Sequence, residues 1–474
     1  MFVMKQHFSL YTERLDNCFC STGVRSGNGP LRFRTLIKTG IALLLAGQVP
    51  LAVAEDISLP RLIDLAIEQD AWLQGSHYQE QAQFARGNSA YQLPDPTISL
   101  KFANLPVDTF NLDQEAMTQV VAGISQMFPP GDSRALKQQQ LHQQGARQPS
   151  LRDDRKAFIR LQLSTIWLGY QQAQRSIKLL QSNLSLYDQL TDITEAGYAS
   201  ALVRVGQDDL IKAQLDRVQV DDRLTRLQQQ ADVSRAQLLL WVYNPDGDYS
   251  FAVSDAIPEI KSRYDQLLSD RVEMQRVIGA TAHHPKVKAI ESQIQAAETG
   301  VQIQHQQYKP QWGINASYGY RADDLNGRDR ADLFSVGVTL QMPLFGSARQ
   351  DSQVQAAVAD VEKLRTQRQL LIRQLRSELL TAQSRKERLS QRQSLYQQQL
   401  LPKARQQVRA TLSAYEVDNG SYSDVIRARI AELNIRLALI EIETEHQLQT
   451  IQMNYLLAGS WNTPVQPEST GVKQ

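Results

Sequence analysis

The sequence of 474 residues contains little cysteine, no long apolar run and almost no net charge. Cys18 and Cys20 are the only cysteines, so the chain beyond them can form no disulfide, thiolate metal site or cysteine nucleophile. No run of 18 apolar residues occurs, which argues against a membrane-spanning helix. Lys and Arg total 51 against 50 Asp and Glu, so no global field favours nucleic acid as a partner.

Catalytic fingerprints are also missing. The sequence has no G-x-S-x-G, H-E-x-x-H, P-loop or dinucleotide motif, so we predict neither an enzyme nor a cofactor. His283 and His284 precede Pro285, and adjacent helical side chains point about 100° apart. No third ligand lies at metal-site spacing, and the methionines do not cluster, so we predict no metal site and interpret the histidine pair as a helix start.

The N-terminal region has the pattern of a secretory signal peptide. Basic residues Arg32, Arg34 and Lys38 precede an apolar run, and Ala52-Val53-Ala54 has the small-residue pattern of a cleavage site. We therefore expect residues 1–54 to be removed during export.

Alternating stretches predict strands with one apolar face. In "FSVGVTLQMPLFG" (334–346) every second residue from Phe334 to Met342 is apolar, and those between are small or polar. "TISLKF" (97–102), "VVAGISQMF" (120–128) and "WGINASYGYR" (312–321) alternate similarly. In the stretch 120–128, Gln126 occupies the position that corresponds to Leu340 in the stretch 334–346, so a polar residue interrupts the apolar face.

Landmarks of the first half recur in the second at a nearly constant shift. Pro94 corresponds to Pro310, Pro129 to Pro343, and Asp209 to Asp424, which are shifts of 216, 214 and 215 residues. Four ordered landmarks, counting Ile124 with Val338, indicate an internal duplication.

The predicted organisation follows from this duplication. Each repeat has a helix, a strand hairpin and a long helical hairpin, and the first helix is expected over 58–92 with Ser58 as cap. The expected ranges are a signal peptide at 1–54, a first repeat at 55–250 with strands in 97–128, a connection at 251–280, a second repeat at 281–460 with strands in 312–342, and a flexible tail at 461–474.

The predicted elements do not fit one globular core. The helical pattern that begins at residue 133 continues for about 65 residues, which makes a helix roughly 100 Å long. Its narrow apolar stripes are typical of helices packed on neighbours. The four strands have the dyad pattern of a membrane barrel, but such a barrel needs about eight strands or more to close. Because lipid tolerates no open edge, several chains must pool their strands. Two chains would give eight strands and a filled interior; three would give twelve and a lumen, which the small or polar inner positions favour.

Taken together, the signal peptide, the two repeats and the tip motifs at Gly206–Asp209 and Gly420–Asp424 resemble the TolC-type outer-membrane efflux factors. The stretch "LPDPTISLKFANLPVDTF…MTQVVAGISQMFPPGD" most resembles the heavy-metal, CzcC-like branch. The resemblance implies a mainly α fold with a small β part. Long coiled-coil helices would form a periplasmic α-barrel, and four strands per chain would contribute to a trimeric 12-stranded transmembrane β-barrel.

The same resemblance implies a function and partners. The chain would be the exit duct of a tripartite efflux system in the outer membrane of a Gram-negative bacterium. A homotrimer embedded in outer-membrane lipid would extend into the periplasm and dock a periplasmic adaptor, or membrane fusion protein. The adaptor would link it to an inner-membrane pump of the resistance-nodulation-division type, and the substrates would include heavy-metal cations.

Family-like residues occur at the expected tip. Tyr415 and Asp424 keep the family spacing of a tyrosine and a constricting aspartate, while Arg427 replaces a second aspartate. Arg427 would either neutralise Asp424 or form an interchain ion pair that holds the tip shut. Asp208 and Asp209 would add acid from the first repeat; the alternative for each aspartate is a carboxylate that stabilises a helix N-terminus.

Two further sets of residues complete the predicted sites. The adaptor would dock at the tip turns, which contain Val205, Gly206, Asn419 and Gly420. Val336, Val338 and Leu340 would face lipid. Two other interpretations remain at this point: a structural or adhesive periplasmic coiled-coil protein with a soluble sheet, and the adaptor itself, although adaptors carry one helical hairpin and no duplicated plan.

Overall fold

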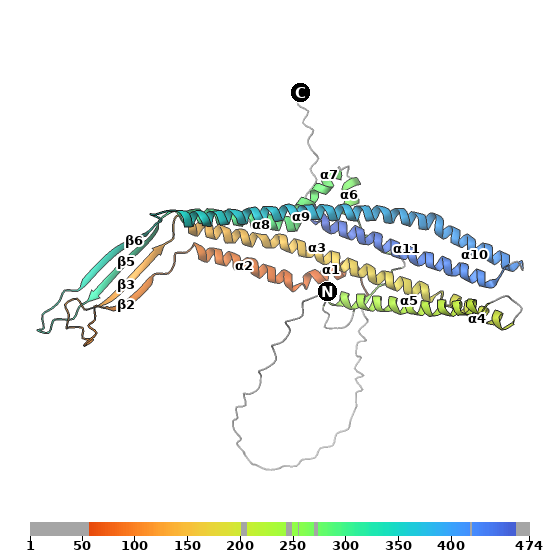
Figure 1. The fold of residues 1–474 in the computed structure, drawn as a ribbon, viewed down its shortest axis with the longest axis horizontal. Helices are drawn as coiled ribbons and strands as arrows, with labels where there is room; N and C mark the ends of the chain where they lie inside the picture. The colour runs from red at the N-terminus through yellow and green to blue at the C-terminus, as the bar shows by residue number, and fades with distance from the viewer. Residues whose placement is uncertain are drawn as a thin grey trace, which may run out of the picture. The chain divides into compact units, whose positions relative to one another are not determined.

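The computed structural model describes residues 56–200, 206–242, 249–254, 256–269, 274–417 and 420–460, all within one compact unit, Ala54–Gln474. The predicted signal peptide at 1–54 and tail at 461–474 lie outside the described residues. The described part is mainly helical with a small sheet, as predicted (Figure 1).

The first repeat contains these elements in chain order: β1 (Asp56–Ile57), α1 (Leu59–Glu68), α2 (Ala71–Tyr91), β2 (Thr97–Ala103), β3 (Gln119–Phe128), α3 (Ser133–Gln181), α4 (Leu184–Ser200), α5 (Gln207–Leu239) and β4 (Ser250–Phe251). The remainder contains α6 (Arg263–Ser269), α7 (Met274–Gly279), η1 (Ala280–His283), α8 (Pro285–Gln306), β5 (Gln311–Tyr320), β6 (Leu333–Gln341), α9 (Ala348–Leu395), the π-helical turn η2 (Tyr396–Leu400), α10 (Leu401–Glu416), α11 (Tyr422–Leu456) and η3 (Ala458–Ser460).

The two strand hairpins join into one antiparallel sheet of order β2-β3-β5-β6. Directly paired residues of antiparallel strands lie on the same face. The register pairs Ile98 with Ile124, Ile124 with Ala316, and Ala316 with Val336, so the apolar positions of all four strands share one face. Strands β2 and β6 are the edges of this sheet and have no partner strand among the described residues.

Gln126 is the polar exception on the apolar face, and the structure gives its reason. It lies near the end of β3, where the facing chain Pro94-Asp95-Pro96 has not yet entered β2. Its Nε2 donates to the carbonyl of Pro94 at 2.7 Å and to that of Met127 at 3.0 Å. Gln126 therefore satisfies backbone acceptors at the junction between the sheet and the helices.

Helices from both repeats pack along one another. Helices α2, α3, α8 and α9 adjoin the sheet and contact each other in that order, and α4, α5, α10 and α11 extend toward the end away from the sheet (Figure 1). Ion pairs tie neighbours together: Arg155 to Asp70 at 2.8 Å and Arg368 to Glu291 at 2.6 Å. The sheet therefore lies at one end of the helices, and the ends of the hairpins α4–α5 and α10–α11 lie at the other.

The helices are more interrupted than the sequence predicts. The helix expected over 58–92 is two helices, because the Asp70 carboxylate accepts the Leu73 N–H at 2.9 Å and starts a second one; Ser58 makes no side-chain cap. Helix α3 ends at Gln181 and α4 begins at Leu184, so the long helix of the first repeat is broken at Ser182 and Asn183. In the second repeat a π-helical turn precedes Pro402, whose missing N–H disturbs the regular ladder.

The connection between the repeats contains regular structure. The expected segment 251–280 contains α6 and α7, and β1 pairs in parallel with β4. Phe251 packs edge-on against Trp167 at 5.7 Å and Tyr170 at 5.9 Å between ring centroids. A second apolar cluster holds α6 and α7 against α9 and the end of α11, with Leu379, Met453 and Leu456 fully buried.

Candidate functional site

The tip of the first repeat is built around the first turn of α5. Asp208 and Asp209 both lie in this turn, where a carboxylate is stabilised by the exposed N–H groups of the helix end. The Asp209 Oδ2 accepts the Gly206 N–H at 3.4 Å, while Asp208 is exposed. Both side chains therefore have a local structural role that does not require a lumen.

Arg427 joins the two repeats at this tip. Its Nη2 lies 3.3 Å from the Asp209 Oδ1, across 218 positions of sequence, and the two side chains are 44% and 39% exposed. Among the described residues Arg427 forms no ion pair with Asp424. Within one chain the arginine thus pairs with the first-repeat aspartate and leaves Asp424 exposed in the first turn of α11.

Aromatic contacts order the tip of the second repeat. The rings of Tyr415 and Tyr422 lie 5.2 Å apart between centroids with an interplanar angle of 50°. The Tyr422 hydroxyl donates to Gln189 Oε1 of α4 at 3.3 Å. Gly420 lets the turn approach α10, because a Cβ there would lie 3.2 Å from the Ala414 Cβ. Val205 and Asn419, predicted for the same turns, lie outside the described residues.

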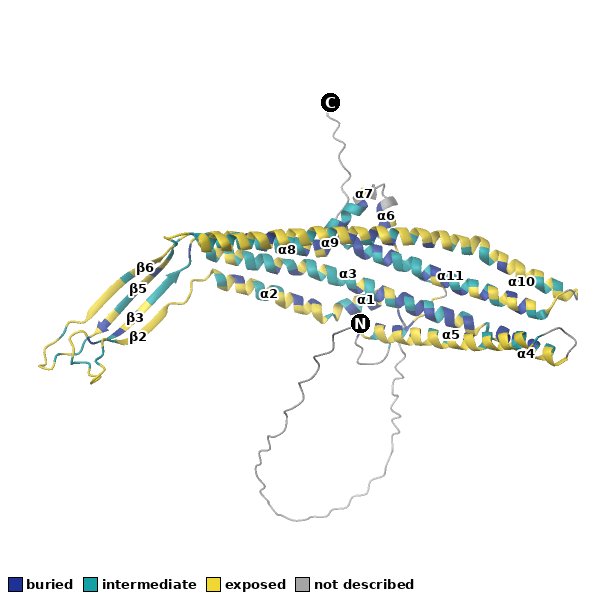
Figure 2. Cartoon of the chain, in the orientation of Figure 1, coloured by how far each residue is buried: buried dark blue, intermediate teal, exposed yellow. Residues whose placement is uncertain are grey.

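The apolar face of the sheet is uncovered within the chain. Val336, Val338 and Leu340 are 65%, 64% and 46% exposed, and Ile98 on the opposite edge strand is 79% exposed (Figure 2). A soluble sheet normally buries such a face against a helix layer or a second sheet. The four strands thus present an apolar surface that needs a cover from outside this chain.

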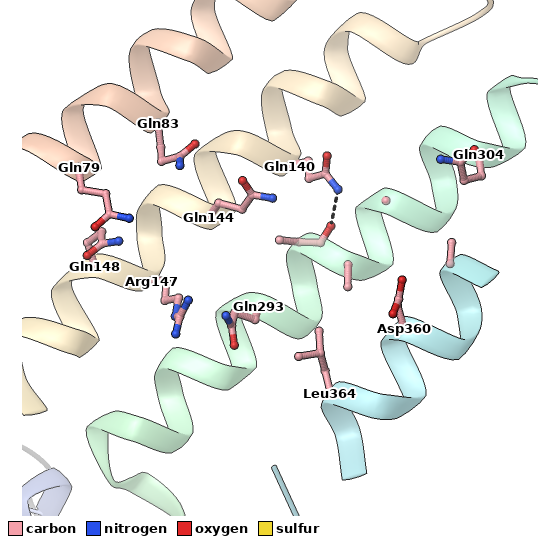
Figure 3. A pocket seen from close by; sticks show the side chains of 14 residues that line it. Gln79, Gln83, Gln140, Gln144, Arg147, Gln148, Gln293, Gln304, Asp360 and Leu364 are labelled. Atoms are coloured by element: carbon pink, nitrogen blue, oxygen red, sulfur yellow. Dashed lines mark hydrogen bonds between the residues drawn. The ribbon is translucent and has the colours of Figure 1, made fainter. Parts of the chain in front are cut away.

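A polar cavity of about 490 Å³ lies between α2, α3, α8 and α9 (Figure 3). Amide side chains dominate its walls, and Gln140 Nε2 donates to the Ala296 carbonyl at 3.2 Å. The residues labelled in the figure are Gln79, Gln83, Gln140, Gln144, Arg147, Gln148, Gln293, Gln304, Asp360 and Leu364. Neutral amides offer hydrogen bonds without a fixed charge, and Arg147 and Asp360 are the charged residues of this lining.

Sequence reasoning did not identify this cavity, although a signal was present. Gln140, Gln144 and Gln148 recur at four-residue spacing, which places them on one helix face. Arg147 joins them with its Nε buried and unpaired among the described residues, and burial lowers the pKa of this guanidinium. Only the fold brings the matching glutamines of α2 and α8 to the same place.

His284 is a structural residue at the start of α8. Its Nδ1 accepts the Lys286 N–H at 3.2 Å, so the proton lies on Nε2, which faces the Tyr455 carbonyl at 3.2 Å. Burial, with Lys286 nearby, lowers the pKa of His284 to about 4, which keeps the ring neutral. The interpretation of the histidine pair as a helix start agrees with this cap.

Among the residues that the structure describes, no group of three or more His, Cys, Asp or Glu side chains is placed to hold a metal ion. None of the described helices combines the length and the apolarity needed to cross a membrane.

Comparisons with known proteins agree with the fold. Residues 279–459 match the sequence model of the family described as outer membrane efflux protein. A search of curated protein sequences found no match. Three solved structures are similar, and the first is CusC, studied for conformational changes accompanying folding and transmembrane channel formation, with a TM-score of 0.66, 14% identity and coverage of 85% of this chain and 92% of that one. VceC of Vibrio cholerae has a TM-score of 0.65 and 16% identity, with coverage of 84% of this chain and 96% of VceC. The open state of the MtrE outer membrane channel of Neisseria gonorrhoeae has a TM-score of 0.63 and 12% identity, with coverage of 84% of this chain and 88% of MtrE.

These comparisons have different reach. The structural matches span nearly the whole chain of each of the three solved structures, and at such low sequence identity they show a shared fold. The family match covers the second repeat, from the end of α7 to η3.

Proposed function

We propose that this chain is the outer-membrane exit duct of a tripartite efflux system. Three chains would pool their sheets into a twelve-stranded barrel, and their helices would form a tunnel through the periplasm. A periplasmic adaptor would dock at the tip turns with Val205, Gly206, Asn419 and Gly420, and would link the duct to an inner-membrane pump of the resistance-nodulation-division type. The chain itself would carry out no chemistry.

The uncovered apolar face between two open sheet edges supports this proposal best. An isolated four-stranded sheet exposing Ile98 and Val338 at 79% and 64% would be unstable in water. Strand β6 runs antiparallel to β2, so the β6 edge of one chain can pair with the β2 edge of the next. Repeating this pairing three times closes the sheet and turns its apolar face toward lipid.

Cysteine crosslinking tests this closure, because the sequence contains no cysteine after Cys20. We would combine Ser99→Cys in β2 with a cysteine scanned over Ser335, Gly337 and Thr339 in β6. Paired positions of adjacent strands are within disulfide reach. We expect at least one combination to give covalent dimers and trimers of outer-membrane protein on non-reducing gels.

The matched control is Ser99→Cys alone, which should give no ladder because three-fold symmetry keeps its copies on separate strands. A scan without any ladder, or recovery of the chain as a soluble monomer without detergent, would contradict the duct. That outcome would favour a structural or adhesive periplasmic coiled-coil protein.

We also propose that the tip is a closed gate in the resting duct. Tyr415, Asp424, Arg427, Asp208 and Asp209 would surround the narrowest part of the tunnel. The ion pair between Asp209 and Arg427 couples the two hairpins of one chain, and its repetition in three chains would hold the tip shut. Asp424, which has no ion pair among the described residues, would give the opening a preference for cations.

Conductance in planar bilayers tests this gate. An exposed ion pair contributes about 0.5 kcal/mol, and three symmetric copies contribute about 1.5 kcal/mol. We therefore expect Arg427→Ala to raise the open fraction roughly tenfold. Asp424→Ala should instead reduce the preference for cations.

The exchange variant Asp209→Arg with Arg427→Asp should restore low conductance, since it rebuilds the pair in reverse. Arg365→Ala removes an ion pair with Glu298 away from the tip, at 2.7 Å, and should leave conductance unchanged. Equal conductance of the wild-type and Arg427→Ala channels would refute the gate.

Heavy-metal cations are the substrate class that we propose. This assignment rests on the resemblance of residues 93–132 to the CzcC-like branch, and the cation preference proposed for Asp424 is compatible with it. Copurification of the pump that works with this duct would distinguish metal ions from organic drugs.

A further inference from the structure

A second cavity, of about 530 Å³, lies next to the glutamine-lined cavity along α3 and has different lining residues. Helix α3, the start of α8, the segment before α6 and the end of α11 surround it. Its volume is that of a site for a small organic molecule. The α3 residues that line it, among them Asp153, Ala157 and Arg160, recur every three or four positions, so they share one face of the helix.

Positive charge is concentrated around this cavity. Lys156, Arg160, Lys261 and Lys288 line it together with a single carboxylate, that of Asp153. In the part of the chain that the structure describes, the side chains of these four cations form no ion pair and no hydrogen bond. Neighbouring basic residues do find partners: Arg152 lies 2.7 Å from Glu80. Arg160, Lys261 and Lys288 are exposed, so water screens their mutual repulsion, but the excess of positive charge around the cavity would attract an anion.

The floor of the cavity is apolar. Ile63, Ala157, Leu161 and Ile451 contribute side chains from α1, α3 and α11, and the Tyr455 ring completes the lining. A purely inorganic anion would gain nothing from such a floor. A molecule with an apolar body and one anionic group would use both the floor and the cations.

Hydrogen bonds fix the Tyr455 side of the cavity in place. The Tyr455 hydroxyl donates to Asp154 Oδ1 at 3.1 Å, and the neutral His284 faces the Tyr455 carbonyl from α8. Lys286 Nζ lies 5.5 Å from the centre of the Tyr455 ring and 4.0 Å from Asp154 Oδ2. Because these contacts exist without a ligand, little ordering would be needed on binding.

We propose that this cavity binds an anionic amphiphile, that is, a small molecule with a carboxylate or sulfonate group and an aliphatic or aromatic body. Lys156 and Arg160, one turn apart on α3, and Lys288 on α8 hold the anionic group, and the apolar floor holds the body. All residues of the site lie in the helical part of one chain, so the proposal goes beyond the duct function without requiring it. It accepts one ligand per chain.

Calorimetry on the full chain in a non-ionic detergent tests the site with 4-phenylbutanoate and its neutral amide. A ligand of this size is expected to bind with a Kd of about 0.1–1 mM, and the amide at least tenfold more weakly. Arg160→Gln and Lys288→Gln should each weaken phenylbutanoate binding roughly fivefold to tenfold. Both residues are exposed, so these changes leave the fold intact.

Two further variants separate charge from space. Ala157→Phe fills the cavity without changing its charge and should abolish binding. Lys403→Gln removes an exposed lysine of α10 outside the cavity and should have no effect. Equal binding of the amide, unchanged affinity in both glutamine variants, or no saturable heat up to millimolar ligand would each overturn the proposal. The last outcome includes a cavity covered by another copy of the chain.

Discussion

Replacing Val338 by lysine is expected to eliminate the chain from the outer membrane, whereas the same replacement one residue later is expected to be tolerated. Val338 pairs with Ile314 on the apolar face of the sheet and is 64% exposed there. A lysine facing lipid near the bilayer midplane costs about 2–4 kcal/mol. In the proposed trimer, three symmetric copies would raise the cost to roughly 6–12 kcal/mol, comparable to the whole stability of a typical domain.

Thr339 is the matched control because it lies on the other face of the same strand. It is exposed, so a lysine there can extend away from the sheet on the side that we assign to the lumen. The measurement is the amount of heat-modifiable trimer in membrane fractions separated by flotation. Equal losses in Val338→Lys and Thr339→Lys would show that the two faces of the sheet are not in different environments.

The sheet was the part of the fold best predicted from sequence. Strand periodicity is local, and Pro129 and Pro343 mark where strands end, so the alternation places β3 and β6 within a residue or two. The pairing of β3 with β5 joins segments almost 200 positions apart, and no local pattern specifies it. Gln126 departs from the apolar pattern because its side chain donates to the Pro94 carbonyl, and periodicity does not encode that contact.

Helix boundaries were predicted less well, because single hydrogen bonds decide them. The break at Asp70 depends on one side-chain cap, and an aspartate within an amphipathic pattern can equally face solvent. The π-helical turn before Pro402 adds one residue to a turn without changing the apolar periodicity. Helices α6 and α7 are too short for a periodic signal and depend on burial against α9 and α11.

Residues of the candidate site showed a similar division. Local spacing predicted that Asp208, Asp209 and Asp424 lie at turns, and all three lie in first turns of helices. The partner of Arg427 could not be predicted, since Asp209 belongs to the other repeat. Asp209 and Asp424 occupy equivalent positions of the two repeats, and Arg427 pairs with the aspartate of the other repeat.

Replacing Gly459 by alanine is expected to destabilise the helical part by about 3 kcal/mol or more. The sequence suggests only a glycine after a helix, where alanine costs about 1 kcal/mol. In the structure a Cβ at Gly459 would overlap the His283 carbonyl oxygen and would lie 2.9 Å from the His284 nitrogen. Both are backbone atoms, so no side-chain rotation relieves the clash.

The clash reaches a region that cannot shift freely. Moving the backbone at His283 pulls the buried His284 from the Tyr455 carbonyl, and Leu456 and Leu457 beside it are fully buried. A lost buried hydrogen bond adds about 1–3 kcal/mol to the cost of overpacking. We expect a lower midpoint of helix melting by circular dichroism, measured at matched scan rates because unfolding of such assemblies is often irreversible.

Gly279→Ala is the matched control, because it changes a glycine of the same connection where nothing lies within 4 Å of the new Cβ. Gly279 already has helical φ of −60° and ψ of −30°, so alanine there should keep or slightly raise the melting midpoint. Equal melting of the two variants would mean that η3 does not pack on the start of α8. If only Gly459→Ala melts early, the close approach of the Gly459 backbone to the His283 backbone fixes the C-terminal turn. The connection between the repeats is then held in place by packing against this turn.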